Sequence, residues 1–262
     1  MASATTSDGV RLALRRFAPA AARRGTVVLA HAMMATSSYL EGLAAHLAAA
    51  GVEAWTFDFR GHGASVPPHP RDGRWGFADY VERDLPAVWD AVRRAVGGPV
   101  SWIGHSLGGL AALAAFGAGI APPPERLVLV AASPWVRAGR GRLVPRAVTA
   151  LLAGLARPLG YLPVRRLRAG TNDEPATYLD ELAGWVRDGR WPWLDGVARI
   201  RAPTYVVVGD RDAYCRMADA RLVADRLGGP VALRIVPGAD HFGFFRRQGA
   251  LWDDLGAFLT AS

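Results

Sequence analysis

Short apolar runs bounded by glycine or proline recur along most of the chain and predict the strands of a sheet. The runs at 25–33, 52–60, 99–106, 126–133, 202–210 and 231–239 are rich in β-branched and aromatic residues. Near-continuous apolar runs of this length are typical of strands covered on both faces. A further run, at 9–17, alternates apolar and polar positions, which predicts a half-exposed antiparallel edge strand.

The segments between these runs have the amphipathic or alanine- and leucine-rich character of helices. Helices are predicted at 39–50, 77–96, 107–117, 216–227 and 246–260. Strand and helix therefore alternate, which predicts an α/β fold with a mostly parallel central sheet flanked by helices. In such folds ligands bind at the carboxyl ends of the strands, so we look for chemistry in the loops that follow them.

One long segment, residues 133–199, breaks the alternation and predicts a helical cap insertion. It has no good strand, but its part 143–162 has the apolar density of a helix interrupted by Pro145 and Pro158. A connection of this length rarely stays irregular in a compact domain. We therefore predict a core domain of residues 1–132 and 200–262, with the cap at 133–199 over the edge of the sheet.

The net charge of +8 comes from the first part of the cap segment, residues 133–170, which has eight arginines and no acidic residue. Removing these eight arginines from the 31 basic residues leaves 23, which equals the 23 acidic residues of the chain. The excess indicates one local basic surface, and no zinc-finger, RNA-binding or basic-zipper signature accompanies it, so nucleic-acid binding is not expected. The surface could be an ordinary solvated face, attract an anionic substrate, or make weak contact with an anionic membrane. The arginines are Arg137, Arg140, Arg142, Arg146, Arg157, Arg165, Arg166 and Arg168.

Cysteine usage and hydropathy favour a cytoplasmic protein. Cys215 is the only cysteine, so no intrachain disulfide can form. The N-terminal residues lack an apolar signal core, and no apolar run reaches the roughly 18 residues that span a bilayer. No metal-ligand spacing or phosphate-binding glycine loop is present, and we expect no cofactor.

Ser106 lies in the pentapeptide Gly104-His105-Ser106-Leu107-Gly108, between a predicted strand and a predicted helix. A serine on so sharp a turn has its hydroxyl exposed above the sheet, near the positive end of the helix dipole. Glycine at positions 104 and 108 removes side chains that would collide with the neighbouring elements. This context favours a nucleophile over a structural turn.

A serine hydroxyl needs a base to take its proton and a carboxylate to orient that base. Among the six histidines, His241 follows the last predicted strand, which is where this architecture places a base. Asp210 and Asp212 both follow the strand at 202–210 and are the candidate acids. Ser, Asp, His is also the chain order known for this architecture. His105 is expected to pack, because it points away on a tight turn.

Backbone amides would stabilise the negative charge on a tetrahedral intermediate. One is the N–H of Leu107, directly after the serine. The other is expected from the turn after the strand at 25–33, with Met33 the best candidate and Ala32 the next.

These motifs together resemble the α/β-hydrolase family across nearly the whole chain. The matching stretches read VVLAHAMMATSSY, AWTFDFRGHGAS, WIGHSLGG, VVVGDRDAY and PGADHF. The first departs from the family's usual His-Gly, since Ala32 follows His31. The resemblance implies a Ser106–His241–Asp212 triad, because the family's acid falls on the aspartate of a Gly-x-x-Asp stretch, and it implies a structural turn around His62. Parts of the cap also resemble a bacterial subgroup of uncharacterised hydrolases.

The cap supplies apolar and aromatic residues that could wall a substrate pocket, and with these we include His31 of the core. The first hypothesis is a serine esterase that cleaves apolar acyl or aryl esters through an acyl-enzyme. An acyltransferase, thioesterase, lactonase or C–C bond hydrolase would use the same residues. A ligand-binding or membrane-surface protein with little turnover is the alternative of another class. The expected pocket residues are His31, Trp135, Tyr161 and Trp185.

Overall fold

Eight strands form one central sheet in the computed structural model, which describes residues 2–136, 143–246 and 249–261. Their spatial order is β1-β2-β4-β3-β5-β6-β9-β10, and every pairing from β4 to β10 is parallel. β1 and β2 pair antiparallel at one edge. The strands are β1 (Ala2–Thr5), β2 (Arg11–Phe17), β3 (Gly25–Ala30), β4 (Val52–Phe57), β5 (Ser101–His105), β6 (Leu127–Val130), β9 (Thr204–Gly209) and β10 (Val231–Val236).

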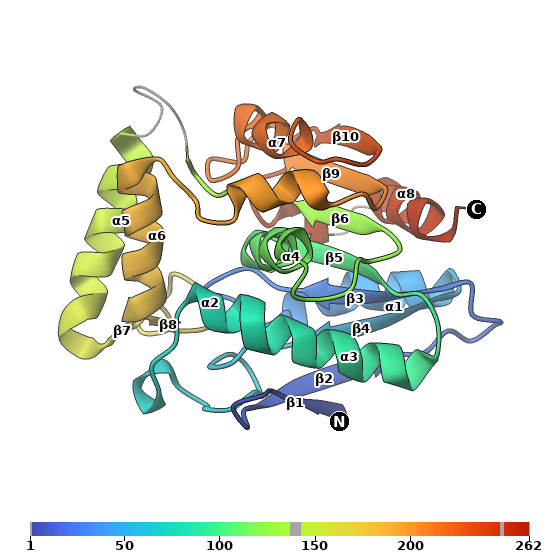
Figure 1. The fold of residues 1–262 in the computed structure, drawn as a ribbon, viewed down its shortest axis with the longest axis horizontal. Coiled ribbons are helices and arrows are strands. Elements are labelled where there is room, and N and C mark those ends of the chain that lie inside the picture. The colour runs from blue at the N-terminus through green and yellow to red at the C-terminus, as the bar shows by residue number, and fades with distance from the viewer. Residues whose placement is uncertain (1, 137–142, 247–248, 262) are drawn as a thin grey trace.

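Helices cover both faces of this sheet (Figure 1). α3 and α4 pack against each other on one face, whereas α1 and α8 pack together on the other. α7 lies against β9 and β10. The long helices are α1 (Glu41–Ala49), α3 (Leu85–Val96), α4 (Leu107–Ala118), α5 (Leu143–Ala156), α6 (Ala176–Asp188), α7 (Met217–Ala224) and α8 (Gly249–Thr260).

The predicted α/β fold is confirmed, since each of the seven predicted strand runs contains a strand of the main sheet. The burial of β3, β4 and β6 along nearly their whole length explains why their sequences are continuously apolar. β1 was not predicted, because its short sequence ASAT has no apolar pattern. It is nevertheless held by pairing with β2, which is a tertiary effect.

The predicted helix at 77–96 is divided in the structure. It consists of α2 (Phe77–Asp79), a π-helical turn at Tyr80–Asp84 and then α3. Pro86, which has no backbone N–H to donate, lies at the start of α3 directly after this π-helical turn. The short 3₁₀ turns are Ser37–Leu40, Pro70–Asp72, Arg157–Leu159, Leu194–Arg199 and Gly243–Phe245.

The segment between β6 and β9 is largely helical, with α5 and α6 packed as a pair beside the carboxyl ends of the strands (Figure 1). The expectation that this segment has no strand was wrong in detail. β7 (Tyr161–Leu162) and β8 (Glu174–Pro175) form a two-stranded ladder too short to leave a period in the sequence. Pro145 lies inside the first turn of α5 and does not interrupt it, whereas Pro158 follows its end.

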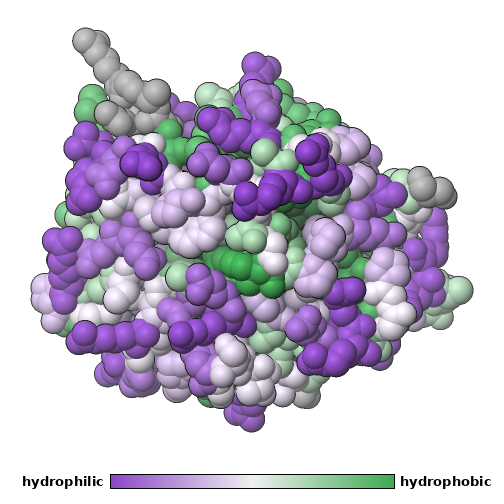
Figure 2. Space-filling model, viewed as in Figure 1, coloured by the Kyte–Doolittle hydropathy of each residue, from purple (hydrophilic) through white to green (hydrophobic). Residues whose placement is uncertain are grey.

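Most of the surface in the view of Figure 2 is hydrophilic, with small apolar patches between the polar side chains. No helix in the described part of the chain is long and apolar enough to cross a membrane. Three of the cap arginines, Arg137, Arg140 and Arg142, lie outside the described residues.

A buried arginine fastens the loop after β4 to two other segments. Arg60 is 4% exposed; its Nε lies 2.7 Å from Asp84 Oδ1, and its backbone N–H donates to the other oxygen of Asp84 at 2.9 Å. Its guanidinium also contacts Asp8, in the turn between β1 and β2, at 2.9 Å. Burial raises the pKa of Asp84 to about 6 in spite of the opposing charge of Arg60. The ionised form of the buried Asp84 carboxyl is therefore stabilised by Arg60.

We expect R60Q to lower the free energy of unfolding by about 3–5 kcal/mol, because it leaves the buried Asp84 charge without its counter-ion. Arg83 is a matched control, since it also contacts Asp8, at 2.8 Å, but is 44% exposed. R83Q should cost less than about 1 kcal/mol. Urea denaturation of the two variants measures the difference, and equal losses would contradict this account.

Candidate functional site

Ser106 occupies the turn between β5 and α4 with a strained backbone. Its φ of 49° and ψ of −109° lie outside the regions that L-residues favour. Close packing enforces this turn. A Cβ at position 104 would lie 2.5 Å from the carbonyl oxygen of Gly108, and one at position 108 would lie 2.6 Å from Ala30 of β3. The two glycines therefore let α4 approach the sheet closely enough to expose the serine hydroxyl.

His241 and Asp212 come together from the loops after β10 and β9. His241 Nδ1 lies 2.9 Å from Asp212 Oδ2. The other oxygen of Asp212 accepts the backbone N–H groups of Tyr214 and Cys215 at 2.8 and 2.9 Å, which fixes the carboxylate. Because Nδ1 is occupied by the carboxylate, Nε2 is the ring nitrogen left to take a proton. Asp210 instead accepts the N–H of Gly238 at an exposed turn.

Ser106 and His241 line the same cavity, which has a volume of about 280 Å³. Most of its other lining side chains are apolar, and they come from both the core and the α5–α6 pair. In the described part of the chain Ser106 Oγ has no hydrogen-bond partner, so its proton is available to a base. The remaining lining residues are Met33, Met34, Trp135, Val148, Leu152, Ala169, Gly170, Leu182, Tyr214 and Phe242.

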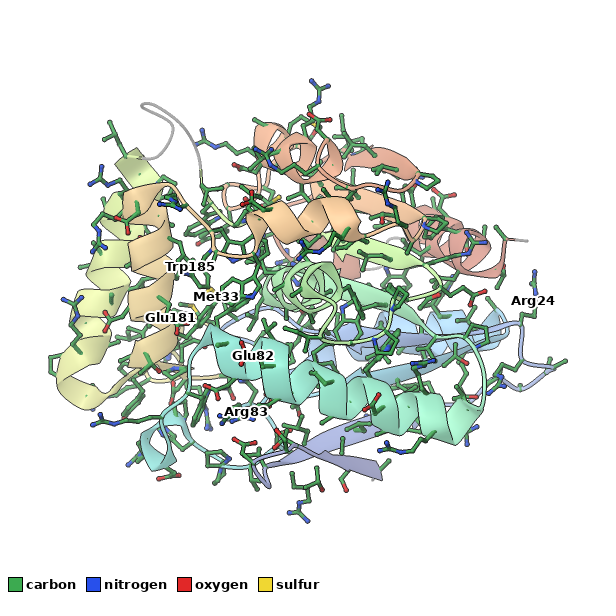
Figure 3. All side chains as sticks on the ribbon, in the orientation of Figure 1. Arg24, Met33, Glu82, Arg83, Glu181 and Trp185 are labelled. Atoms are coloured by element: carbon green, nitrogen blue, oxygen red, sulfur yellow. The ribbon has the colours of Figure 1, made fainter. Side chains whose placement is uncertain are left out.

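The loop after β3 presents the backbone N–H of Met33 as a candidate oxyanion donor. The amides on either side are already engaged: Ala32 N–H donates to the Tyr39 hydroxyl at 2.8 Å, and Met34 N–H donates to Glu174. Neither Met33 N–H nor Leu107 N–H makes a hydrogen bond within the described residues. Met33 is therefore the better candidate of the pair considered from the sequence. Figure 3 shows its side chain between the α6 helix and the sheet.

A buried chain of hydrogen bonds links this loop to the His241 loop through His105. His105 Nε2 lies 2.8 Å from the carbonyl oxygen of His241, so that nitrogen must carry the proton. His105 Nδ1 then accepts from the Tyr39 hydroxyl at 2.7 Å, and the same hydroxyl accepts from Ala32 N–H. Burial holds the pKa of His105 well below its usual range. His105 directly precedes Ser106, and its neutral ring thus bonds this turn to both the Tyr39 segment and the His241 loop.

Of the four predicted pocket residues, Trp135 lines the cavity and the other three are not among its described lining residues. His31 is fully buried beneath the loop, with Nδ1 2.8 Å from the Ala32 carbonyl oxygen and Nε2 accepting the Phe59 N–H. Tyr161 packs against the His69 ring, with centroids 4.6 Å apart. These two predictions were wrong, because sequence cannot tell a buried support from an exposed wall.

Trp185, the third of these residues, is 8% exposed and packs on the side of α6 that faces α2. Its ring centroid lies 5.0 Å from that of Phe77 and 5.8 Å from that of Trp193. It was therefore also wrong as a pocket residue. Aromatic contacts with core residues account for its burial.

Several residues that form the site gave no recognisable signal in the sequence. Tyr39 sits at the start of a helical stretch and Glu174 in a short polar segment of the cap. Val148 and Leu152 follow the apolar period of α5, but the period does not reveal which side faces the cavity. His62 is fully buried and pairs with Glu174 at 2.9 Å, in agreement with a structural turn.

Within the described residues, no three His, Cys, Asp or Glu side chains are grouped so as to hold a metal ion. That the protein uses no cofactor stays a prediction from the sequence. Chemically, the arrangement offers a hydroxyl, an imidazole oriented by a carboxylate, and two unpaired amides beside one apolar cavity. These are the components of nucleophilic acyl transfer.

We expect Y39F to lower the free energy of unfolding by about 2 kcal/mol, because it leaves Ala32 N–H and His105 Nδ1 without their partner. Y205F is the control, since the Tyr205 hydroxyl makes no hydrogen bond within the described residues. That variant should change stability by less than about 0.5 kcal/mol. Urea denaturation distinguishes the two, and an equally stable Y39F would refute the bridging role.

Comparisons with known proteins show the family of the chain and the relatives of its fold. The family model described as serine aminopeptidase, S33, matches residues 21–180. A monoacylglycerol lipase from Mycolicibacterium smegmatis is 29% identical over 100% of this chain and 99% of its own length. A hydrolase from Pseudomonas aeruginosa PA01 is 25% identical with a TM-score of 0.70, covering 99% of this chain and 98% of that one.

An esterase from Exiguobacterium antarcticum shares the fold with a TM-score of 0.72 at 18% identity, covering 99% of both chains. The family model spans more than half of the sequence, and its matched region contains Met33 and Ser106. Together with the eight-stranded, mostly parallel sheet, this match identifies the protein as an enzyme of the α/β-hydrolase fold that belongs to the S33 serine aminopeptidase family.

Proposed function

We propose that the protein is a serine esterase that cleaves carboxylic esters with apolar acyl or aryl groups. The observation that carries the proposal is that Ser106 and the Asp212-bound His241 line one cavity with mostly apolar walls. The relatives named as a lipase and an esterase support the same type of bond. Apolar walls favour an apolar acyl group, because its burial releases water from both surfaces.

In the proposed mechanism, Ser106 Oγ attacks the ester carbonyl carbon while His241 Nε2 takes the hydroxyl proton. The negative charge that develops on the carbonyl oxygen is stabilised by the N–H groups of Met33 and Leu107. Asp212 holds the imidazolium through Nδ1. His241 then returns the proton to the leaving alcohol, which departs and leaves an acyl group on Ser106.

Water completes the cycle by the same groups in the opposite order. His241 removes a proton from a water molecule, whose oxygen attacks the acyl carbonyl, and the proton passes to Ser106 as the acid is released. In an acyltransferase, another acceptor would take the place of this water. In a thioesterase, lactonase or C–C bond hydrolase, the serine would attack the carbonyl carbon of the corresponding substrate in the same way. Measuring how the acyl group partitions between water and an added alcohol separates transfer from hydrolysis.

The test is a series of p-nitrophenyl esters of increasing acyl length, assayed with wild type, S106A and D212N. We expect the highest kcat/KM at acyl chains of about four to eight carbons, because a 280 Å³ cavity lies at the lower end of ligand-site volumes. S106A should lower kcat by about 10⁴-fold or more, and D212N by about 10⁴-fold. D210N is the matched control and should retain activity.

Two results would overturn the proposal. Unchanged hydrolysis by S106A would show that Ser106 is not the nucleophile. Equal losses of activity in D210N and D212N would refute the assignment of Asp212 as the acid that orients His241. A protein that only binds ligands would also fail to react with a fluorophosphonate probe, since labelling requires an activated serine.

We also propose that the exposed apolar face of α5 at the rim of the cavity makes weak contact with an anionic lipid surface. Six large apolar residues of the cap are 51–66% exposed: Leu143, Val144, Leu151, Leu155, Leu159 and Leu167. Val144, Leu151 and Leu155 share the helix face of Val148, which lines the cavity. The same segment of the chain carries exposed arginines, which suit an anionic lipid surface. The described ones are Arg146, Arg157, Arg165, Arg166 and Arg168.

Co-sedimentation with vesicles tests this contact. We expect binding to vesicles with about 30% phosphatidylglycerol that falls sharply between low and 0.5 M salt, since surface attraction is screened. Binding to neutral phosphatidylcholine vesicles should be much weaker, and L151S/L155S should bind less to both. L233S, on the exposed edge strand β10, is the control. Binding that ignores salt and the α5 substitutions would refute the proposal.

A further inference from the structure

A short segment of the cap, residues 170–174, encloses the backbone of Met34. The carbonyl oxygen of Met34 accepts the N–H groups of Thr171 at 2.9 Å and Asn172 at 3.2 Å. Its N–H donates to Glu174 Oε1. A side chain at Gly170 would come within 2.4 Å of the same carbonyl oxygen, so the two backbones lie in direct contact. Both polar backbone atoms of Met34 are therefore held by the cap.

Met34 needs this support because its backbone is left-handed. Its φ of 58° is unfavourable for a residue with a side chain and persists only where surrounding contacts fix it. Met34 follows Met33, whose N–H is the proposed oxyanion donor. The conformation of Met34 thus limits where the preceding amide can lie.

Glu174 also contacts the loop indirectly, through the buried side chains of His62 and His31. Its Oε1 lies 2.9 Å from His62 Nε2, and both side chains are fully buried. His62 Nδ1 faces the Arg60 carbonyl oxygen at 3.0 Å, so both ring nitrogens face acceptors and the ring is an imidazolium. Burial opposes this charge, but Glu174 outweighs it and raises the pKa of His62.

The His62 ring lies against the ring of His31, with centroids 4.9 Å apart. His31 Nδ1 in turn donates to the Ala32 carbonyl oxygen at 2.8 Å. That carbonyl belongs to the same peptide plane as Met33 N–H. Burial, followed by the nearby His62 cation, lowers the pKa of His31 to about 4, which keeps the ring neutral. Because Nε2 accepts the Phe59 N–H, the ring proton lies on Nδ1, as this bond requires. Glu174 therefore supports the Met33 amide along a second route.

We propose that Glu174 is a positioning residue of the cap that completes the oxyanion hole by fixing the Met33–Met34 backbone. The inference rests on the proposed function, because it assumes that Met33 N–H binds the oxyanion formed on attack by Ser106. It goes beyond that function in making the chemical step depend on the seating of the cap. A misplaced oxyanion donor weakens binding of the transition state more than binding of the substrate.

The test compares E174A with E174Q on p-nitrophenyl butyrate. E174A should lower kcat by about 10- to 100-fold, because a donor displaced by about 1 Å loses much of its effect, with KM within about threefold of wild type. Affinity for a boronic acid that mimics the tetrahedral intermediate should fall by a similar factor. E174Q should recover kcat to within about fivefold, because its amide oxygen can still accept Met34 N–H.

D173A is the matched control. Asp173 is the neighbouring buried acid and also joins the cap to the core, through His69 Nε2 at 3.0 Å. Its other oxygen accepts Arg165 N–H at 2.8 Å, and within the described residues its carboxylate makes no hydrogen bond to the Met34 loop. D173A should keep kcat and boronate affinity within about threefold of wild type. Were E174A not to fold, E174D carries the test, since its shorter side chain withdraws the carboxylate from Met34 and should lower kcat about tenfold.

Wild-type kcat and boronate affinity in a folded E174A or E174D would overturn the proposal, and so would equal losses in D173A. S106A, assayed in parallel, distinguishes this failure from that of the esterase mechanism. If S106A is inactive while E174A resembles wild type, only the role of Glu174 is refuted. If S106A keeps its activity, both proposals fall.

Discussion

The chain passes from β5 into α4 within a single residue, and the site depends on that turn. Ser106 adopts φ 49° and ψ −109° because the helix is pressed against the sheet at Gly104 and Gly108, where no side chain could fit. The strain costs on the order of 1–3 kcal/mol, and the packing of a buried helix against buried strands offsets it. A looser contact between α4 and the sheet would let the turn relax and lower the hydroxyl into the surface.

Around this turn, buried polar side chains fix the relative positions of the loops through directional hydrogen bonds, which apolar packing lacks. His105, Tyr39 and Ala32 form one hydrogen-bonded chain, while His62 and Glu174 form a buried ion pair. The His105–Tyr39 and His62–Glu174 bonds each join separate segments of the chain, so moving one segment leaves a buried polar atom unpaired on the other. Such networks hold separate loops in register, because hydrogen bonds depend on direction as well as distance.

The cap has two kinds of contact with the core, and they have different consequences. Its apolar side chains, among them Val148 and Leu152, form part of the cavity wall and bear on which substrate fits. Its polar segment around Glu174 contacts the loop that carries Met33. Under the proposed function, this inserted segment therefore contacts both the substrate cavity and the loop that carries the oxyanion donor. We expect a substitution in the segment to change substrate specificity or rate, depending on which contact it alters.

The sequence alone determined the α/β fold, because burial on both faces leaves a continuous apolar run in each parallel strand and the intervening helices leave their own period. It also singled out Ser106 and His241, since each follows a recognisable strand and two glycines mark the turn at the serine. The strand position left Asp210 and Asp212 as candidate acids, and the resemblance to the family favoured Asp212. Only the tertiary structure decided which histidines support the loops, that His31 lies beneath the site, and that Glu174 reaches Met34. Those contacts join residues up to 140 positions apart, and a pairing between distant side chains leaves no periodic trace along the chain.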